Sequence, residues 1–493
     1  MKKIVTSIIA AAALWAGTTA FVGNQMKENL QNQIDNSNKL YASNGVSYKI
    51  NNYKKSFLTS QAEIEINFTD PTVLELIGDS IKLPIVIKYD IEHGPLFFKN
   101  GLGFGAARTH QKIPLSSLLT EKAKEEFLTL IKDDIMINSD MDISFTKNAS
   151  YTVSTNKVNI NNDGKSFNMT PLTMKGNHNL DTYKGDAKLN IASLKFQEEG
   201  TQNGLTVQDL DINIDMDEFI EKALMLGTID LSIKNLTIKD ENDPQLDNVN
   251  IATNLHIVTK KDSKTTISTE LNGDVDFKDT KLPKELPDLK NIHLKMNMEH
   301  IGIKGMIEFQ KVSKEMQEAQ SQILTKMQSN PKEEEMQKIF EELGTIQQNM
   351  MGKIVHSLDK LLIKDKTLIE YGLGVETKNS KKSNANVKIG YAGDIQFDGS
   401  IEEIAKRVQE QVLDLINLNV NIALDSEHIN SLPNAEMLKM QIQMGVAQGF
   451  VKEENGKYIL NGYYKNQELM VNENNLTATV LPFLMMASQG GGF

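Results

Sequence analysis

The chain has 493 residues, of which 40% are hydrophobic and 24% charged, and its 65 acidic and 53 basic side chains give a net charge of −12. This composition is that of a globular protein with two or three packing units, and it excludes wholesale disorder and a polytopic membrane protein. The negative charge disfavours nucleic-acid binding, and the absence of cysteine excludes disulfides, thiolate nucleophiles and Cys-ligated zinc.

The N-terminus carries an apolar stretch. Lys2 and Lys3 precede uncharged residues 4–22, which as a helix span roughly 28 Å, nearly the hydrocarbon core of a bilayer. We therefore expect residues 1–25 to form a transmembrane anchor with its N-terminus inside, which places the bulk of the chain outside the cytoplasm. The alternative is a cleaved signal peptide with Thr18-Thr19-Ala20 at its cleavage site. Residues 26–42 are predicted to form a solvated helical stalk.

Residues 43–310 are predicted to form an antiparallel β-rich domain. Apolar and polar side chains alternate with period two, which is typical of strands with one buried and one solvated face. Turn sequences such as Asn162-Asp163-Gly164 separate the strands and favour a meander. The alternation argues against a parallel α/β sheet, because the strands of such a sheet are buried on both faces and have continuous apolar sequences. The clearest alternating runs are 62–68, 85–91 and 210–216.

Helical periodicity appears in five places. Shorter helices are predicted at 118–131 and 216–226, a long helical block at 311–362 that divides at Ser329-Asn330-Pro331, and amphipathic helices at 401–416 and 435–448. We expect residues 311–493 to be a helical and β region that completes the sheet. The fold class is therefore α+β and β-rich, with an N-terminal transmembrane helix, a long, curved antiparallel sheet and packing helices mainly in the C-terminal half.

No motif for catalysis, a metal or a cofactor was found. None of the eight histidines has a compact ligand spacing, and no G-x-S-x-G nucleophile elbow occurs. The glycine-rich segment 101–105 lacks the spacing of a nucleotide-binding loop and is interpreted as an ordinary loop. We therefore predict no catalytic, metal-binding or cofactor-binding residues and a protein that is not an enzyme.

The long helical block is rich in methionine, a side chain that adapts to irregular apolar ligands. One interpretation is an apolar groove between the sheet and these helices that binds a lipid. The alternative is ordinary core packing. The predicted lining is Met327, Met336, Phe340, Leu343, Met350 and Met351.

His93, Gly94 and Pro95 follow an alternating strand. The glycine supplies backbone freedom, and the proline fixes φ and ends sheet pairing. The motif is interpreted as a strand terminator, with a contact to a partner or ligand as the alternative.

The segments 48–68 and 90–96, the second containing His-Gly-Pro, and Asn455 to Gly462 near the other end resemble the YdgA-like family of Gram-negative envelope proteins of unknown function. The resemblance implies a single-pass inner-membrane protein whose bulk is periplasmic. It implies no reaction and no catalytic residue.

Three functions follow as hypotheses. The first is envelope maintenance or the handling of lipids or other apolar ligands. The second is a tethered scaffold that binds partner proteins of surface or motility structures. The third, an envelope hydrolase, lacks a recognisable nucleophile, metal site or acid pair. The expected partners are the inner membrane, lipid and envelope proteins, with no nucleic acid and no cofactor.

Overall fold

The computed structural model describes residues 30–31, 34–35, 38, 45–56, 58–69, 74, 77–99, 101–131, 133–221, 224–241, 249–278, 280, 287–328, 333–432 and 434–480. The chain forms two compact units: unit 1 is residues 1–234 with 320–325, and unit 2 is residues 235–319 with 326–493. This division differs from the predicted boundary at 310/311, and the predicted domains themselves stay a prediction.

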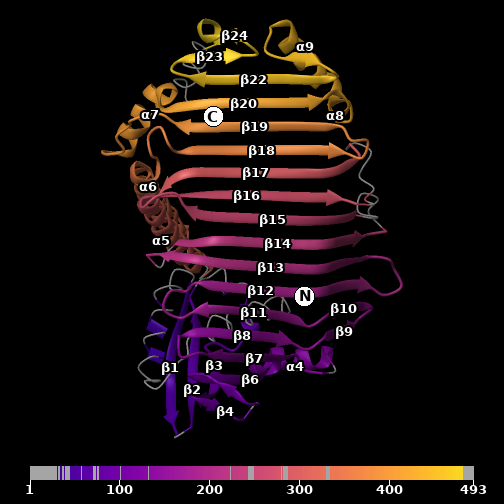
Figure 1. The fold of residues 1–493 in the computed structure, drawn as a ribbon, viewed down its shortest axis with the longest axis vertical. Helices are drawn as coiled ribbons and strands as arrows, with labels where there is room; N and C mark the ends of the chain where they lie inside the picture. Colours follow the sequence, from indigo (N-terminus) through magenta and orange to yellow (C-terminus); the bar gives the residue numbers. More distant parts are fainter. Residues whose placement is uncertain are drawn as a thin grey trace. The chain divides into compact units, whose positions relative to one another are not determined.

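Unit 1 is an antiparallel meander, shown in Figure 1 from indigo to magenta. Neighbouring strands pair in the order β1-β2-β3-β6-β7-β8-β11-β12-β13, and β9 and β10 form a hairpin whose second strand pairs with β12. The strands are β1 (Val46–Lys55), β2 (Thr59–Phe68), β3 (Ile85–His93), β6 (Ala107–Pro114), β7 (Met136–Ile143), β8 (Asn148–Thr155), β9 (Val158–Asn162), β10 (Lys165–Met169), β11 (Leu172–Asn179), β12 (Gly185–Glu198) and β13 (Gly204–Ile220). The division between the units falls within β14 (Leu224–Lys239).

One face of this meander is buried in a single large core. From Ala62 to Phe68 in β2 and from Ile85 to Ile91 in β3 every second side chain is apolar and buried, while the intervening Glu65 stays partly accessible. The alternation predicted for 62–68 and 85–91 is therefore confirmed. Helix α4 (Glu121–Leu130) contributes Ala123 to the same core.

The described residues of the predicted stalk are helical, and the polar Gln31 and Asp35 among them are exposed. Leu30 and Ile34 are buried in the core of unit 1. The Asn38 side chain donates to the carbonyl of Tyr48 and accepts from its N–H, at 2.9 and 2.7 Å, and so ties the segment to β1. Leu30 and Ile34 are four residues apart and so lie on one helical face, which explains how they reach the core while Gln31 and Asp35 stay in solvent.

The predicted fold class needs a correction at its N-terminal helix. No described helix is both long enough and apolar enough to cross a membrane, because the longest helices carry Glu, Lys and Gln along their whole length. Residues 1–25, where the anchor was predicted, lie outside the described residues.

Unit 2 is also an antiparallel meander, in which Figure 1 shows the strands side by side. Pairing runs β15-β16-β17-β18-β19-β20-β22-β23-β24, and β21 also pairs with β22. The strands are β15 (Val249–Lys261), β16 (Thr266–Phe277), β17 (Leu289–Gly302), β18 (Leu368–Thr377), β19 (Lys382–Tyr391), β20 (Ile416–Asp425), β21 (Lys452–Glu454), β22 (Lys457–Lys465), β23 (Glu468–Val471) and β24 (Asn474–Asn475).

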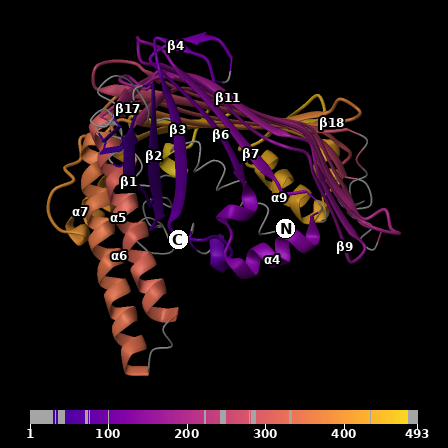
Figure 2. The same cartoon turned by 90° about the horizontal axis from the view of Figure 1, so that it is seen from below.

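Two long helices, α5 (Ile303–Gln328) and α6 (Glu333–Leu361), form an antiparallel hairpin between β17 and β18 (Figure 2). Ion pairs such as Lys326–Glu342 hold the helices together. The base is tight because Gly302 and Gly305 lie against the backbone of Lys360 and Leu361, where a Cβ atom would clash. Three further helices are α7 (Ile401–Leu415), capped by Ser400, α8 (Ser426–Asn430) and α9 (Ala435–Ala447).

Two predicted helix positions are wrong. The described residues of 216–226 are not helical: β13 continues to Ile220 and β14 begins at Leu224, because sheet pairing overrides a weak local helix pattern. The long helical block begins at Ile303 instead of 311, directly after β17.

The His-Gly-Pro motif ends β3, as predicted, and leads into a second, small sheet of β4 (Leu96–Phe97) and β5 (Gly103–Phe104). Gly94 donates to Ala106 O at 2.9 Å, and Gly105 donates to Pro95 O at 3.1 Å. A Cβ atom at Gly94 would overlap the carbonyl oxygen of Gly105. Glycine is therefore required here by the close approach of two backbones.

We expect Gly94→Ala to destabilise the chain by about 1–3 kcal/mol, the usual cost of overpacking. The control is Gly344→Ala in α6, where nothing lies within 4 Å of the added atom and the gain in helix propensity is about 0.5–1 kcal/mol. Urea unfolding of the two variants measures both effects. A Gly94→Ala midpoint at or above that of the wild type would contradict the packing argument.

A second prediction concerns pH. Burial of His178 in the core of unit 1 lowers the pKa of its imidazole to about 4. Between pH 6.5 and 4 the unfolded chain binds a proton that the folded chain does not, so this contribution to stability is complete above pH 6.5 and is lost as the pH falls towards 4. The loss amounts to about 3 kcal/mol. Urea unfolding across this range should show a smaller loss for His178→Leu, and an identical loss would rule out His178 as its source.

Candidate functional site: an apolar sheet face

The pairing register of unit 2 sorts the side chains of its strands into two very different faces. On one face, which we call the apolar face, residues that pair from β15 to β22 form continuous rows without a charge. One row is Leu255, Gly273, Leu294, Leu373, Ala385, Ile422 and Leu460. The next row is Ile257, Leu271, Met296, Tyr371, Val387, Val420 and Gly462.

The opposite, polar face consists of amide and charged side chains that satisfy one another. Its central member is Glu370, which is only 6% exposed and accepts from Asn386 at 2.7 Å and Lys295 at 3.3 Å, with the Lys388 ammonium 3.5 Å away. Burial alone raises the pKa of Glu370, but these hydrogen bonds and lysine charges outweigh it and lower the pKa below its ordinary value. On the same face His293 contacts Asp274 at 2.9 Å. These pairs stabilise the sheet and leave the polar face solvated.

The apolar face is not covered to the extent that a core would be. Leu294, Tyr371 and Leu373 lie in adjacent rows near its centre and are 44–48% exposed. In unit 1 the corresponding positions of β2 and β3 are almost fully buried. Among the described residues of unit 2, the apolar rows are therefore exposed at the neighbouring strands β17 and β18, and their large side chains on the strands to either side are partly accessible.

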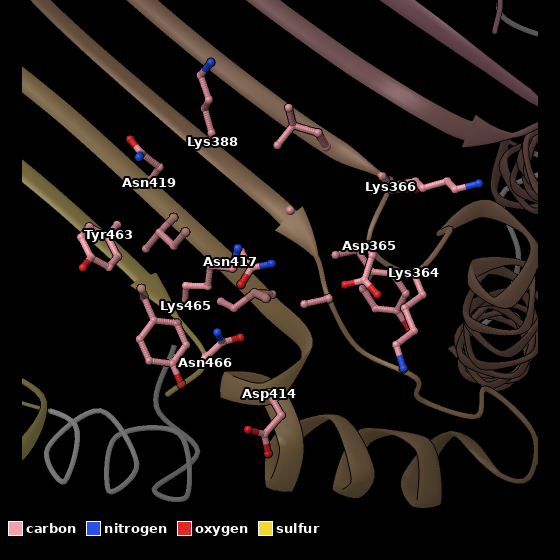
Figure 3. A pocket seen from close by; sticks show the side chains of 18 of the residues that line it. Lys364, Asp365, Lys366, Lys388, Asp414, Asn417, Asn419, Tyr463, Lys465 and Asn466 are labelled. Carbon is pink, nitrogen blue, oxygen red and sulfur yellow. The ribbon is translucent and has the colours of Figure 1, made fainter. Parts of the chain in front are cut away.

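A pocket of about 1070 Å³ lies at one end of these strands (Figure 3). Leu418 and Tyr464 line it from the apolar face, and Lys388, Asn419 and Tyr463 from the polar face. Lys364, Asp365 and Asp414 also line it, and Figure 3 labels them beside the strand ends. Tyr464 is 4% exposed and its hydroxyl has no hydrogen-bond partner in the described part of the chain. Burial, with the nearby Asp414 charge, raises the pKa of Tyr464, so the phenol is a neutral donor beside the pocket.

The predicted groove residues lie along the helical hairpin, and the structure does not gather them over the sheet. Met336, Leu343 and Met350 follow a helical stripe with the buried Ile339 and are partly buried, as is Met327 at the end of α5. Phe340 and Met351 are 55% and 53% exposed. The role of these six residues in binding stays a prediction. The sequence predicted strands with one apolar face, but it did not indicate that Leu294, Tyr371 and Leu373 would be exposed.

The described residues contain one buried serine–histidine pair. Ser383 Oγ lies 2.6 Å from His428 Nδ1 and accepts from the Asp425 N–H at 2.9 Å. Both side chains are buried, so a substrate has no access to the hydroxyl. Asp425 instead caps α8 by accepting from Glu427 N at 3.0 Å. The pair therefore joins β19 to α8. No group of three or more His, Asp or Glu side chains suited to a metal occurs in the described ranges.

These features define a β-rich protein of antiparallel meanders, one of which presents an accessible apolar face. The chain belongs to a bacterial protein family of unknown function, DUF945, whose family model matches residues 1–478. Comparisons with curated proteins and with solved structures found no match.

Proposed function

We propose that the protein binds a long-chain lipid on the apolar face of unit 2 and works as a lipid-handling factor without catalysis. The observation that carries this proposal is the set of charge-free rows whose central residues, Leu294, Tyr371 and Leu373, are nearly half exposed. Exposed apolar area of this kind is unfavourable in water, and burial against an apolar ligand recovers about 25 cal/mol for each Å².

The dimensions of the face suit an acyl chain. A row crosses seven strands from β15 to β22, which at about 4.8 Å between strands corresponds to roughly 29 Å. One leaflet of a bilayer, and hence one acyl chain, is about 15 Å deep. Gly273 and Gly462 have no side chain and therefore leave depressions in the rows. A flexible chain can bend into such depressions, whereas a rigid ligand cannot.

The pocket at the strand ends supports an amphiphilic ligand. It shares Leu418 and Tyr464 with the apolar face and adds lysine, amide and carboxylate side chains. Sites for small molecules combine an apolar lining with a few polar groups that fix orientation. A lipid with its chain along the rows would place its polar end here, where Tyr464 offers an unused hydroxyl.

The test is the uptake of a fluorescent long-chain fatty acid by delipidated full-length protein. We expect saturable binding that Leu294→Lys weakens at least about tenfold, because the row then presents a charge to the chain. Leu294 is already 48% exposed, so a lysine there can reach water and the fold is retained. The matched control is Asn421→Lys, an exposed position on the polar face, which should leave binding unchanged.

Three outcomes would overturn the proposal: no saturable uptake, equal weakening by both variants, or no effect of Leu294→Lys. A stoichiometric protein in place of lipid, seen by native mass spectrometry of protein purified from its own envelope, would favour the scaffold hypothesis.

A location in the bacterial envelope is part of this proposal. The basic start and apolar stretch of residues 2–22 support export, and the resemblance of segments 48–68, 90–96 and 455–462 supports a place among the YdgA-like proteins. Protease added to cells with a permeabilised outer membrane should degrade the described units. Protection of both units in intact spheroplasts would contradict export.

A further inference from the structure

A hairpin in unit 1 exposes large apolar side chains that the proposed lipid-binding face does not use. It consists of β4, β5 and the described residues 98–99 and 101–102 between them, and follows directly after His-Gly-Pro. Leu96, Phe98, Leu102 and Phe104 are between 53% and 85% exposed. Leu96 and Phe104 are paired across the hairpin, and Phe98 and Leu102 lie two residues further along its arms, so strand alternation places all four on one side.

The surrounding residues hold this hairpin in place. Phe97, on the opposite side, is 1% exposed and lies beneath the Arg108 guanidinium, 4.9 Å from its ring centroid. Arg108 donates to both carboxylate oxygens of Asp142, at 2.6 and 2.9 Å, and to Gly101 O at 2.9 Å. The carboxylate of Glu92 accepts from the backbone N–H groups of Phe98 and Lys99. The outward direction of the four apolar side chains is therefore fixed by the fold.

Two neighbouring segments enlarge the apolar tip. Phe145, 57% exposed, contacts Phe104 edge to face at 5.3 Å between ring centroids. Leu58 is 60% exposed and lies on the β1–β2 turn. Its carbonyl oxygen accepts a hydrogen bond from His93 N at 2.8 Å, at the base of the hairpin. We call the six residues Leu58, Leu96, Phe98, Leu102, Phe104 and Phe145 the apolar tip.

Three lysine side chains lie next to the apolar tip. Lys54 and Lys55 precede the β1–β2 turn, and Lys99 lies in the hairpin connection; all three are exposed and have no ion-pair partner within the described ranges. The nearby acids Glu92 and Asp142 are already engaged with the hairpin backbone and with Arg108. The tip therefore combines projecting aromatic and leucine side chains with free positive charge.

We propose that the apolar tip inserts into the interfacial region of a lipid bilayer that contains anionic lipids. Apolar side chains of interfacial proteins enter the boundary between headgroups and acyl chains, and flanking lysines add attraction to anionic headgroups. A projecting tip suits a fluid surface, which deforms around it, whereas a protein partner needs a complementary hollow. The docking fixes the side of unit 1 that faces the bilayer.

The test uses the absence of cysteine from the full-length chain, because a single introduced cysteine then carries a unique label. Leu102→Cys is labelled with an environment-sensitive nitrobenzoxadiazole dye and mixed with vesicles of phosphatidylcholine and phosphatidylglycerol. We expect a blue shift of emission and shielding from iodide. The control label at Lys157→Cys, an exposed polar position in the β8–β9 connection, should show neither. Because the readout is local, association of the vesicles with any other part of the chain does not produce it.

Two further variants separate the physical contributions. Phe98→Ser with Phe104→Ser should abolish the blue shift at position 102 without lowering thermal stability, since both rings are already exposed. Neutralising Lys54, Lys55 and Lys99 to glutamine should remove the preference for phosphatidylglycerol over pure phosphatidylcholine vesicles. A label at 102 that stays in water with vesicles, or that shifts equally at 157, overturns the proposal. A blue shift that rises with protein concentration and needs no vesicles also overturns it, and assigns the tip to a contact between copies of the chain.

Discussion

Antiparallel pairing gives every strand two faces, and the structure depends on what covers the apolar one. In unit 1 that face is buried: Ile64 and Ile91 are almost fully enclosed, and Leu30 and Ile34 of the N-terminal helical segment complete the core. In unit 2 the same type of strand carries Leu294 and Leu373 into solvent. The strands of both units show the same alternation of apolar and polar side chains. The units differ in how completely other residues bury the apolar side chains.

The polar face of unit 2 shows why a sheet with an accessible apolar side can still be stable. Its charges are internally paired around Glu370, so this face gains little from a partner and stays hydrated. Unpaired buried charge costs several kcal/mol, and each lysine or asparagine beside Glu370 removes part of that cost. The rows of the opposite face carry no such charges, so an apolar ligand bound there would displace no ion pair.

The sequence alone predicted the β-rich antiparallel architecture, because alternation at runs such as 62–68 is a strong local signal. Alternation reports that two faces differ and does not report what covers the apolar one, so Ile64 and Leu294 look alike in sequence although one is buried and the other is not. The methionine pattern predicted a groove between the sheet and the helical hairpin, lined by residues of the helices. The helix predicted at 216–226 failed because pairing between distant strands outweighed a local preference.

The glycine-rich segment 101–105 was interpreted as a loop, and its sequence carried a signal that the interpretation left unused. Leu102 and Phe104 stand between glycines, which offer no neighbouring side chains to shield them. The inward-facing positions of the hairpin, Phe97 and Gly103, are closely packed, whereas Leu102 and Phe104 are exposed. Hydrogen bonds of Arg108 and Glu92 hold the hairpin in the orientation in which its apolar side chains point into solvent. The fold of unit 1 thus holds these apolar side chains in solvent, and their burial in another apolar phase would be favourable.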